Sequence, residues 1–412
     1  MRAWTASVET RLLCWRRVRE FAVPSSMIET ATVRRGVGDW AGACAAARVD
    51  VDFDVRAVAR DIAPLLRDDL RYLAPDLLRW HMPRVAPDGL LRPGLTVALA
   101  RYPGGLQLVA RTPPGWAEAG QRISLALQRK SDPRFRLDLH RHLWDARRAE
   151  DLRSRPGMSD KADEHRWVVE AAILLRADGR DDRLVTVRLG ARRRLLVNLD
   201  SGIATPAGLL VAASDTAHRV SASKAPLLPY AATWLPPDVE LMRAGLIDAD
   251  RLHPLVAAAL APGIPHARDG DRDSSMLVEC RGATHRIGLR GGKPIPLDHD
   301  PEEIQREELL ASLGGPPMPC LQAIDRAIRR PDELPAIRAR LDHGDTAGAL
   351  AVVQRLLGPE ILLRDGPLRE ELVAAAERRV DHGLFRAGLA GLCPLGPLRA
   401  VVRGRPRHCF AR

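Results

Sequence analysis

The chain has 412 residues, more than one hydrophobic core usually organises, so two or three domains are expected. Lysine and arginine number 63 against 52 aspartates and glutamates, which gives a net charge of +11. Only four of the 63 basic residues are lysines, and this arginine bias is typical of a GC-rich coding sequence. The basic charge is therefore weak support for a nucleic-acid partner, which requires a basic face and not only a basic total.

The six cysteines include no C-x-x-C pair, so their spacing indicates neither a zinc knuckle nor a compact disulfide framework. They are typical of reduced thiols in the cytoplasm, where we expect the protein to be located. No run approaches 18 uncharged apolar residues, so neither a membrane span nor a membrane partner is expected. No cofactor is predicted.

The first part of the chain is predicted to be mostly helical. Residues 1–26 lack the apolar run of an export signal and are interpreted as a non-native or disordered extension. Within residues 27–92, leucines at i, i+4 and i+7 from Leu66 indicate an amphipathic helix, and Pro75 begins another segment. From Asp39 to Met82 we expect three helices, with His81 packed at a helix end.

Residues 93–223 are predicted to form an antiparallel β-rich domain, because the hydrophobic period changes from near 3.6 to 2. LTVALARY and LQLVART flank Gly104 and Gly105 as a hairpin, and RISLALQ follows as another strand. WVVEAAILLRA, RLVTVRLG and RRRLLVNL continue this meander. Short turns need no crossover helix, and no G-x-G-x-x-G is present, so a doubly wound nucleotide fold is not expected.

The rest of the chain divides into four segments by composition. Residues 224–275 are an irregular proline-rich connection with one short helix, 276–299 a small β-meander, 300–392 a helical region and 393–412 a basic tail. The expected fold class is therefore α+β, with helical N- and C-terminal regions flanking a central antiparallel meander sheet.

One short sequence occurs twice, as GDWAGACA at 38–45 and GDTAGALA at 344–351. Gly-Asp followed by small residues predicts a helix start, because the aspartate carboxylate accepts hydrogen bonds from the first free amides. Two copies so far apart do not form a fixed-period repeat array.

The segment PLDHDPEEIQREEL concentrates acidic side chains, and most of them have a structural explanation. Asp300 is placed as an N-cap, Pro301 at the first helical position, and Glu302 and Glu303 in the first turn, where the helix dipole favours anions. Glu303 is also placed for a reciprocal capping box.

Two residues of this segment, Asp298 and His299, precede the cap and are candidate catalytic residues together with His285. Alternation along a predicted strand turns His285 toward the interior, where a neutral imidazole needs a hydrogen-bond partner. A purely structural hydrogen bond between His285 and this segment is the favoured alternative.

A second histidine cluster, LDLHRHLWDARR, offers His140, His142 and Asp138 as candidate metal ligands. On a strand the two histidines would share a face and could bind one divalent metal. On a helix they diverge, and Asp138 and His142 would form an ion pair at i, i+4. We favour this second alternative, a solvated helix.

Two groups of arginines are candidate phosphate contacts: Arg192, Arg193 and Arg194 within the meander, and Arg403, Arg405 and Arg407 in the tail. Aromatic residues for stacking on unpaired bases are nearly absent around both groups, which disfavours a single-strand binder. Arginines that flank a strand are also ordinary solvated edge residues.

The sequence favours a non-catalytic protein-interaction or accessory protein, because no catalytic constellation is recognisable. The expected partner is another protein. One alternative is an enzyme, metal-dependent in one form, that uses either His285 with Asp298–Asp300 or His140 with His142. A second alternative is a duplex nucleic-acid binder acting through the arginine-rich tail.

Overall fold

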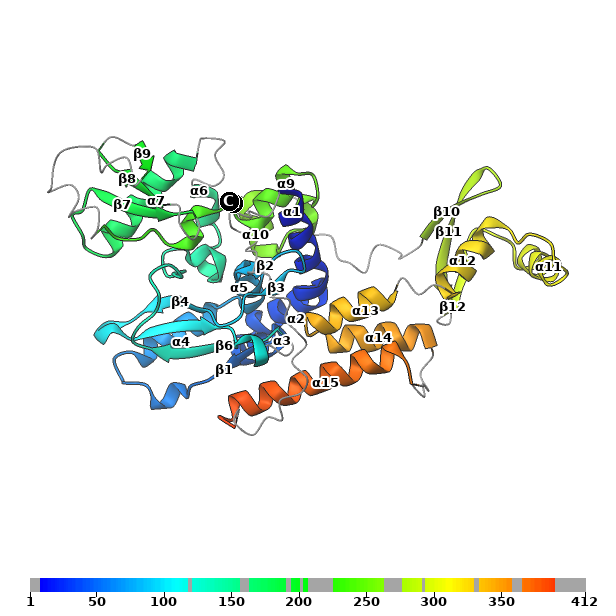
Figure 1. The fold of residues 1–412 in the computed structure, drawn as a ribbon, viewed down its shortest axis with the longest axis horizontal. Coiled ribbons are helices and arrows are strands. Elements are labelled where there is room, and N and C mark those ends of the chain that lie inside the picture. The colour runs from blue at the N-terminus through cyan, green and yellow to red at the C-terminus, as the bar shows by residue number, and fades with distance from the viewer. Residues whose placement is uncertain are drawn as a thin grey trace. The chain divides into compact units, whose positions relative to one another are not determined.

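The fold was obtained as a computed structural model, which describes residues 8–117, 121–155, 163–189, 194–200, 203–206, 225–262, 276–290, 293–329, 333–357 and 365–389. The chain forms two compact units, with residues 1–266 and 378–412 in unit 1 and residues 267–377 in unit 2 (Figure 1). Helices and several small sheets confirm the α+β class. Among the described residues, no helix is long and apolar enough to cross a membrane.

Unit 1 begins with a run of helices. The second and third helices of the predicted group begin with a proline in the first turn, where its missing amide donor costs no hydrogen bond. The helices of unit 1 are α1 (Val8–Arg17), α2 (Ser25–Gly36), α3 (Trp40–Ala46), α4 (Ala63–Tyr72), α5 (Pro75–His81), α6 (Asp151–Ser154), α7 (Asp163–Ala177), α9 (Pro237–Arg243) and α10 (Pro254–Leu260).

Side chains between Cys14 and Val23 are buried in the core of unit 1, so this part of residues 1–26 is not a disordered extension as predicted. Trp15 in α1 is fully buried and packs against Trp80, with the ring centroids 5.6 Å apart. Cys14 and Val18 are also fully buried in the same core. The sequence did not reveal this role, because the apolar residues of this segment are interrupted by adjacent arginines.

The main sheet of unit 1 has the order β1-β6-β5-β4. The predicted hairpin is confirmed, and Gly104 and Gly105 have positive φ values of 69° and 76° in its turn. The sheet is not a strict meander, because β1 pairs in parallel with β6. Its strands are β1 (Val49–Val51), β4 (Thr96–Arg101), β5 (Gln107–Arg111) and β6 (Ile123–Gln128), and a separate pair is formed by β2 (Arg84–Val85) and β3 (Leu90–Leu91).

A second, separate sheet of unit 1 has the order β7-β8-β9, with β7 (Leu184–Arg188), β8 (Arg194–Asn198) and β9 (Ile203–Pro206). The segment WVVEAAILLRA, predicted as a strand, is instead part of helix α7. Trp167, Ala171 and Leu174 are buried at i, i+4 and i+7, which is the helical period. The predicted single β-domain is therefore two small sheets with a helix between them in sequence.

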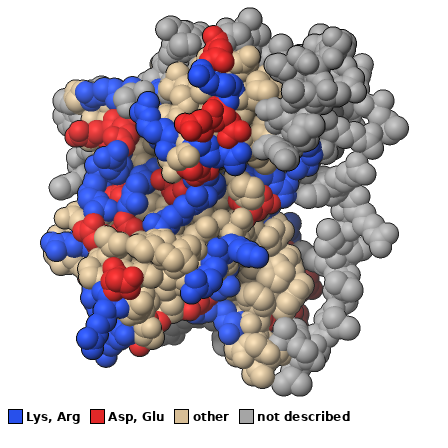
Figure 2. All heavy atoms as spheres, turned by 90° about the vertical axis from the view of Figure 1, so that its left-hand side faces the viewer, with Lys and Arg blue, Asp and Glu red and all other residues tan. Residues whose placement is uncertain are grey.

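Many arginines of unit 1 pair with carboxylates. Asp145 is fully buried, and its carboxylate lies 2.8 Å from the guanidinium of Arg141 and 3.0 Å from that of Arg147. The guanidinium of Arg147 also lies 3.2 Å from the carboxylate of Asp69. On the face drawn in Figure 2, lysine and arginine side chains lie beside aspartate and glutamate side chains and do not form a continuous basic surface. The arginine content of this unit thus contributes to its structure through ion pairs.

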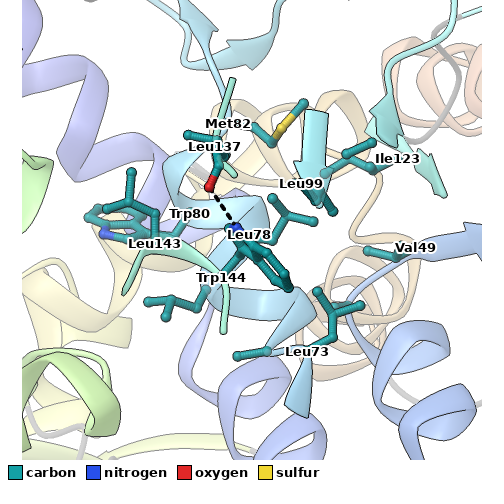
Figure 3. Close-up of a cluster of buried hydrophobic side chains, with 14 of the residues drawn as sticks. Val49, Leu73, Leu78, Trp80, Met82, Leu99, Ile123, Leu137, Leu143 and Trp144 are labelled. Carbon is teal, nitrogen blue, oxygen red and sulfur yellow. Dashed lines mark hydrogen bonds between the residues drawn. The ribbon is translucent and has the colours of Figure 1, made fainter. Parts of the chain in front are cut away.

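The core of unit 1 joins the N-terminal helices to the main sheet (Figure 3). Trp144 is fully buried there, and its indole Nε1 donates to the carbonyl oxygen of Leu137 at 3.0 Å. His81, at the end of α5, is buried as predicted, and its Nδ1 lies 3.0 Å from the carbonyl oxygen of Leu77. These polar groups have hydrogen-bond partners inside the core. The core also holds buried charged side chains, such as Asp238, whose carboxylate lies 3.3 Å from Nε2 of His81.

Unit 2 contains the predicted small meander, in the order β10-β11-β12, followed by helices. The turn between its first two strands, at Arg281 and Gly282, has positive φ values of 53° and 82°. The elements are β10 (Met276–Cys280), β11 (Ala283–Arg290), β12 (Lys293–Pro296), α11 (Pro301–Ser312), α12 (Pro319–Arg329), α13 (Glu333–Asp342), α14 (Thr346–Leu357) and α15 (Pro367–Arg386), whose last turns belong to unit 1.

The two copies of the Gly-Asp sequence both begin helices, as predicted. In α3 the amide of Gly42 donates to the Asp39 carboxylate at 2.8 Å, and before α14 the amide of Gly348 donates to Asp345 at 3.2 Å. A Cβ atom on either glycine would lie within about 2 Å of that carboxylate, at 2.1 Å and 2.2 Å respectively. The glycine therefore leaves room for the capping side chain in both copies.

Candidate metal centre

The candidate site of unit 2 starts at the β10–β11 hairpin. Cys280 is the last residue of β10 and pairs with Ala283, while His285 of β11 pairs with Val278. Residues two apart on paired strands lie on the same face, so Cys280 and His285 are diagonal neighbours on one side of the hairpin. Cys280 is 1 % exposed and His285 is half-buried.

The third residue, His299, is positioned by the turn that follows β12. The carboxylate of Asp298 accepts from the backbone amide of Arg286 at 2.7 Å and from its guanidinium at 2.7 Å, which ties this turn to β11. These hydrogen bonds hold the pKa of Asp298 at about 2. Asp298 is thus a structural residue, and His299 next to it turns inward with a side chain that is 3 % exposed.

The fourth residue, Cys320, is the second residue of α12 and is fully buried. It forms a small apolar cluster with Cys280 and Met318, against which Val278 and Ile304 pack. Burial and the adjacent Cys280 thiol raise the pKa of Cys320 to about 11. Both cysteines are free.

The four side chains converge on one point. The Nδ1 atom of His285 lies 2.6 Å from Nε2 of His299 and 4.0 Å from Sγ of Cys320, and one ligand atom from each of Cys280, His285, His299 and Cys320 lies within 4.8 Å of all the others. In a tetrahedral zinc site, with Zn–N near 2.0 Å and Zn–S near 2.3 Å, neighbouring ligand atoms are about 3.3–3.8 Å apart. The separations observed between the four ligand atoms, from 2.6 Å to at most 4.8 Å, lie on both sides of that range.

A carboxylate supports one of the imidazoles from behind. Nδ1 of His299 lies 3.1 Å from Oε2 of Glu303, on the side of the ring opposite to the cluster, and the guanidinium of Arg281 lies 2.7 Å from the same carboxylate. The hydrogen bond with His299 and the nearby charges of Arg281 and Arg306 lower the pKa of Glu303. A carboxylate that accepts from the outer ring nitrogen of a histidine is the usual support of a metal-binding imidazole.

The helix cap of this segment is as predicted, but the capping box is not. The carboxylate of Asp300 accepts from the amide of Glu302 at 2.9 Å, which begins α11. Glu303 does not return to the cap. Its carboxylate contacts His299 and Arg281 instead, because both lie within reach on the side of the cluster.

The predicted candidates of unit 2 are therefore only partly brought together. His285 and His299 meet, whereas Asp298 pairs with Arg286. Cysteine spacing did not reveal the two thiols, which lie 40 residues apart in the sequence. The one local signal was the spacing Cys280-x₄-His285 on a hairpin, which is short enough to place two ligands on one metal.

The other histidine cluster does not form a metal site with Asp138. The Asp138 carboxylate pairs with the guanidinium of Arg136 at 2.8 Å, away from both histidines. His140 and His142 are 3 % and 4 % exposed and lie in a turn with a short 3₁₀ segment, which corrects the prediction of a solvated helix. Their ring centroids are 5.8 Å apart and their neighbour is Glu170, whose carboxylate lies 3.1 Å from Nε2 of His140.

The candidate phosphate contacts are mostly outside the described residues. Arg192, Arg193, Arg403, Arg405 and Arg407 all lie there. Arg194 begins β8, where it is exposed and pairs in register with Arg188.

Comparisons of the chain with protein-family models, with curated proteins and with solved structures found no match. The assignment of the metal centre therefore rests on the residues and the geometry described above.

Proposed function

We propose that unit 2 binds one Zn²⁺ ion through Cys280, His285, His299 and Cys320, and that this ion holds helix α11 in place as a docking element for another protein. The observation that carries the proposal is the convergence of two thiols and two imidazoles, one of them supported by Glu303. The protein is, in this proposal, a non-catalytic interaction protein.

The donor set supports zinc over other cations. Two thiolates and two imidazole nitrogens in a tetrahedral arrangement suit Zn²⁺, whereas Mg²⁺ and Ca²⁺ prefer oxygen ligands. Four protein ligands also complete the tetrahedral shell. A closed shell of this kind is typical of structural zinc, because a catalytic zinc keeps one position for water or substrate.

The small size of the apolar cluster supports a structural role for the metal. Among the described residues of this part of unit 2, the buried apolar side chains are only Cys280, Ile287, Pro296, Met318 and Cys320, and none of the residues of α11 is buried. So small a core contributes little stability, and small modules of this kind commonly gain their folding free energy from a metal. His299 directly precedes α11 and Cys320 follows it, so the ion would fix both ends of this helix.

Helix α11 and the residue after it present an apolar surface. Leu309, Leu310 and Leu313 are 63 %, 52 % and 79 % exposed. Exposed leucines gathered on one short segment are typical of a protein contact. The same helix carries four glutamates and one arginine, so the partner that we propose is a protein segment with an apolar stripe bordered by lysine or arginine.

The charge of α11 also bears on the alternatives. An acidic helix repels phosphates, so this module is not proposed to contact nucleic acid. The closed ligand set leaves no position for a substrate, so the metal-dependent enzyme is not proposed at this site either.

Zinc content tests the metal part of the proposal. The full chain, purified under reducing conditions, should contain one zinc per chain by elemental analysis, and Cys320→Ala should lose it. Cys44→Ala, which removes a buried thiol of unit 1, should retain the metal. Metal-free protein in which all six thiols of the chain are free, or a disulfide between Cys280 and Cys320, would overturn the proposal.

A cross-linking comparison tests the docking part. Carbodiimide joins a carboxylate to a lysine at contact, so partners captured from cell extract should be cross-linked through Glu302 or Glu308, two exposed residues of α11. The same cross-link should be lost with Leu309→Ser/Leu313→Ser and with Cys320→Ala, and kept with Leu65→Ser, a control at an exposed leucine of α4. Cross-links unaffected by the leucine or cysteine changes would contradict the docking role.

A further inference from the structure

We infer that the proposed zinc site is also a site of reversible oxidation, at which a hydroperoxide converts Cys280 and Cys320 to a disulfide and thereby releases the zinc ion. This inference rests on the proposed function, because it requires the metal to be bound. It adds a chemical condition for zinc occupancy, and hence for the metal that holds helix α11.

The two thiols of the site come from different elements and are neighbours in space. Cys280 is the last residue of β10, and Cys320 is the second residue of α12. Their sulfur atoms lie within 4.8 Å of each other, and the two thiols interact. Since a disulfide joins its sulfurs at about 2.05 Å, the two atoms have to approach by less than about 3 Å.

Zinc binding places these two sulfurs in the reactive state. The thiolate, and not the thiol, is both the metal ligand and the nucleophile. A buried cysteine without a metal differs in this respect, as Cys44 of unit 1 illustrates. Burial and the charges of Asp39 and Asp76 raise the pKa of Cys44 to about 12, so its thiol is protonated at neutral pH. A peroxide should therefore react with the zinc-bound pair in preference to Cys44.

The cover over the two thiols is thin. Cys280 and Cys320 are 1 % and 0 % exposed, so a peroxide reaches them only past their neighbours. One neighbour is His285, which is half-buried and whose Nδ1 lies 4.0 Å from Sγ of Cys320. The apolar cluster beneath is small, and no residue of α11 is buried. A region with so few buried contacts opens locally at low free-energy cost, which admits a molecule as small as hydrogen peroxide.

The reaction balances with the peroxide as the only oxidant. One thiolate attacks an oxygen of the peroxide, the O–O bond breaks, and a sulfenic acid and a hydroxide ion are formed. The second thiolate attacks the sulfenic sulfur, the S–O bond breaks, and a second hydroxide ion leaves as the disulfide forms. The two sulfurs together lose two electrons, and the peroxide gains them.

The disulfide leaves too few ligands to hold the metal. Of the four ligands only the imidazoles of His285 and His299 remain, whereas structural zinc takes four. The disulfide keeps α12 joined to β10 in place of the metal. The start of α11 loses its metal contact, and the hydrogen bonds between Asp298 and Arg286 are then its tie to β11. Oxidation thus acts on α11, the proposed docking element.

Zinc release from the full chain tests the inference. Zinc-loaded protein is treated with hydrogen peroxide in the presence of a chromogenic chelator, and the disulfides are mapped by mass spectrometry. One zinc should be released for each disulfide between Cys280 and Cys320, and a thiol reductant followed by zinc should restore the site. Zinc that is retained in peroxide, or released without this disulfide, would overturn the inference. A chain that holds no zinc before peroxide is added would instead contradict the proposed function.

Two variants separate disulfide formation from other effects of peroxide. Cys280→His keeps four ligands but removes one thiol, so peroxide should release its zinc at least about tenfold more slowly. Cys44→Ala should release zinc at the rate of the unmodified chain. If Cys280→His does not bind zinc, Cys320→His takes its place, and the ratio of zinc to disulfide in the unmodified chain decides in either case. Equal release rates in the unmodified chain and a zinc-binding histidine variant would overturn the inference.

Discussion

The carboxylate of Glu303 lies 3.1 Å from Nδ1 of His299, on the side of the imidazole that faces away from Cys280, His285 and Cys320. Glu303, in the first turn of α11, therefore supports His299, a proposed metal ligand. It fixes the ring orientation and directs Nε2 toward the other three donors.

Glu303→Gln should weaken zinc binding by about ten- to a hundredfold, because the amide cannot supply the negative charge that increases the basicity of His299. The affinity can be measured by competition with a chromogenic chelator. Glu308→Gln, an exposed glutamate of the same helix, should leave the affinity unchanged. A similar loss in both variants would indicate a general charge effect of α11.

Zinc binding should release at least one proton at pH 7. In the metal-free chain the pKa of Cys320 is about 11, so its thiol is protonated, whereas zinc binds the thiolate. The affinity should consequently rise with pH, by about tenfold per unit for each proton released. Calorimetric titrations in buffers of different ionisation enthalpy count these protons. Binding without proton release would contradict coordination by Cys320.

Trp15→Ala should lower the free energy of unfolding by about 3–5 kcal/mol, because the ring is fully buried against Trp80. Urea unfolding followed by circular dichroism measures this loss. The matched control is Trp116→Ala. Trp116 is 52 % exposed, and its ring makes a T-shaped contact with the ring of Phe385. Its cost should be about 0.5–1.5 kcal/mol. Equal losses would mean that the N-terminal helix does not contribute specially to the core.

Asp50→Asn should destabilise unit 1 by about 1.5–3 kcal/mol at pH 7. Burial would raise the pKa of Asp50, but hydrogen bonds from Arg122, the imidazole of His382 at 3.6 Å and the charge of Arg386 hold it well below the usual range. A lowered aspartate pKa stabilises the fold above the ordinary value near 4, and this contribution is lost as the pH falls through the folded value.

The difference between Asp50→Asn and the unmodified chain should therefore be constant at neutral pH and decrease below about pH 4. Thermal unfolding over a pH series measures it. Asp88→Asn, which breaks an exposed pair with Arg17, should cost less than about 1 kcal/mol at every pH. A difference for Asp50→Asn that grows on acidification would contradict the assigned ion pairs.

Local patterns were sufficient where a segment decides its own conformation. The hairpin at Gly104 and Gly105, the cap at Asp300 and the helix starts at Asp39 and Asp345 were all predicted, because turn and capping chemistry depend on a few adjacent residues. The α+β class also followed from periodicity. The strand predicted in WVVEAAILLRA was wrong, since an almost continuous apolar run fits both a buried strand and a buried helix.

The sequence by itself determined the hairpin that carries Cys280 and His285 and the helix that follows His299. Only the tertiary structure decided that Cys320 completes this set and that Trp15 belongs to the core, because both depend on contacts between segments far apart in the chain. Ligand convergence is a property of packing and not of spacing. For the same reason Asp138, close to the histidines in sequence, contacts Arg136, whereas Glu170, 30 residues from His140, is the carboxylate beside it.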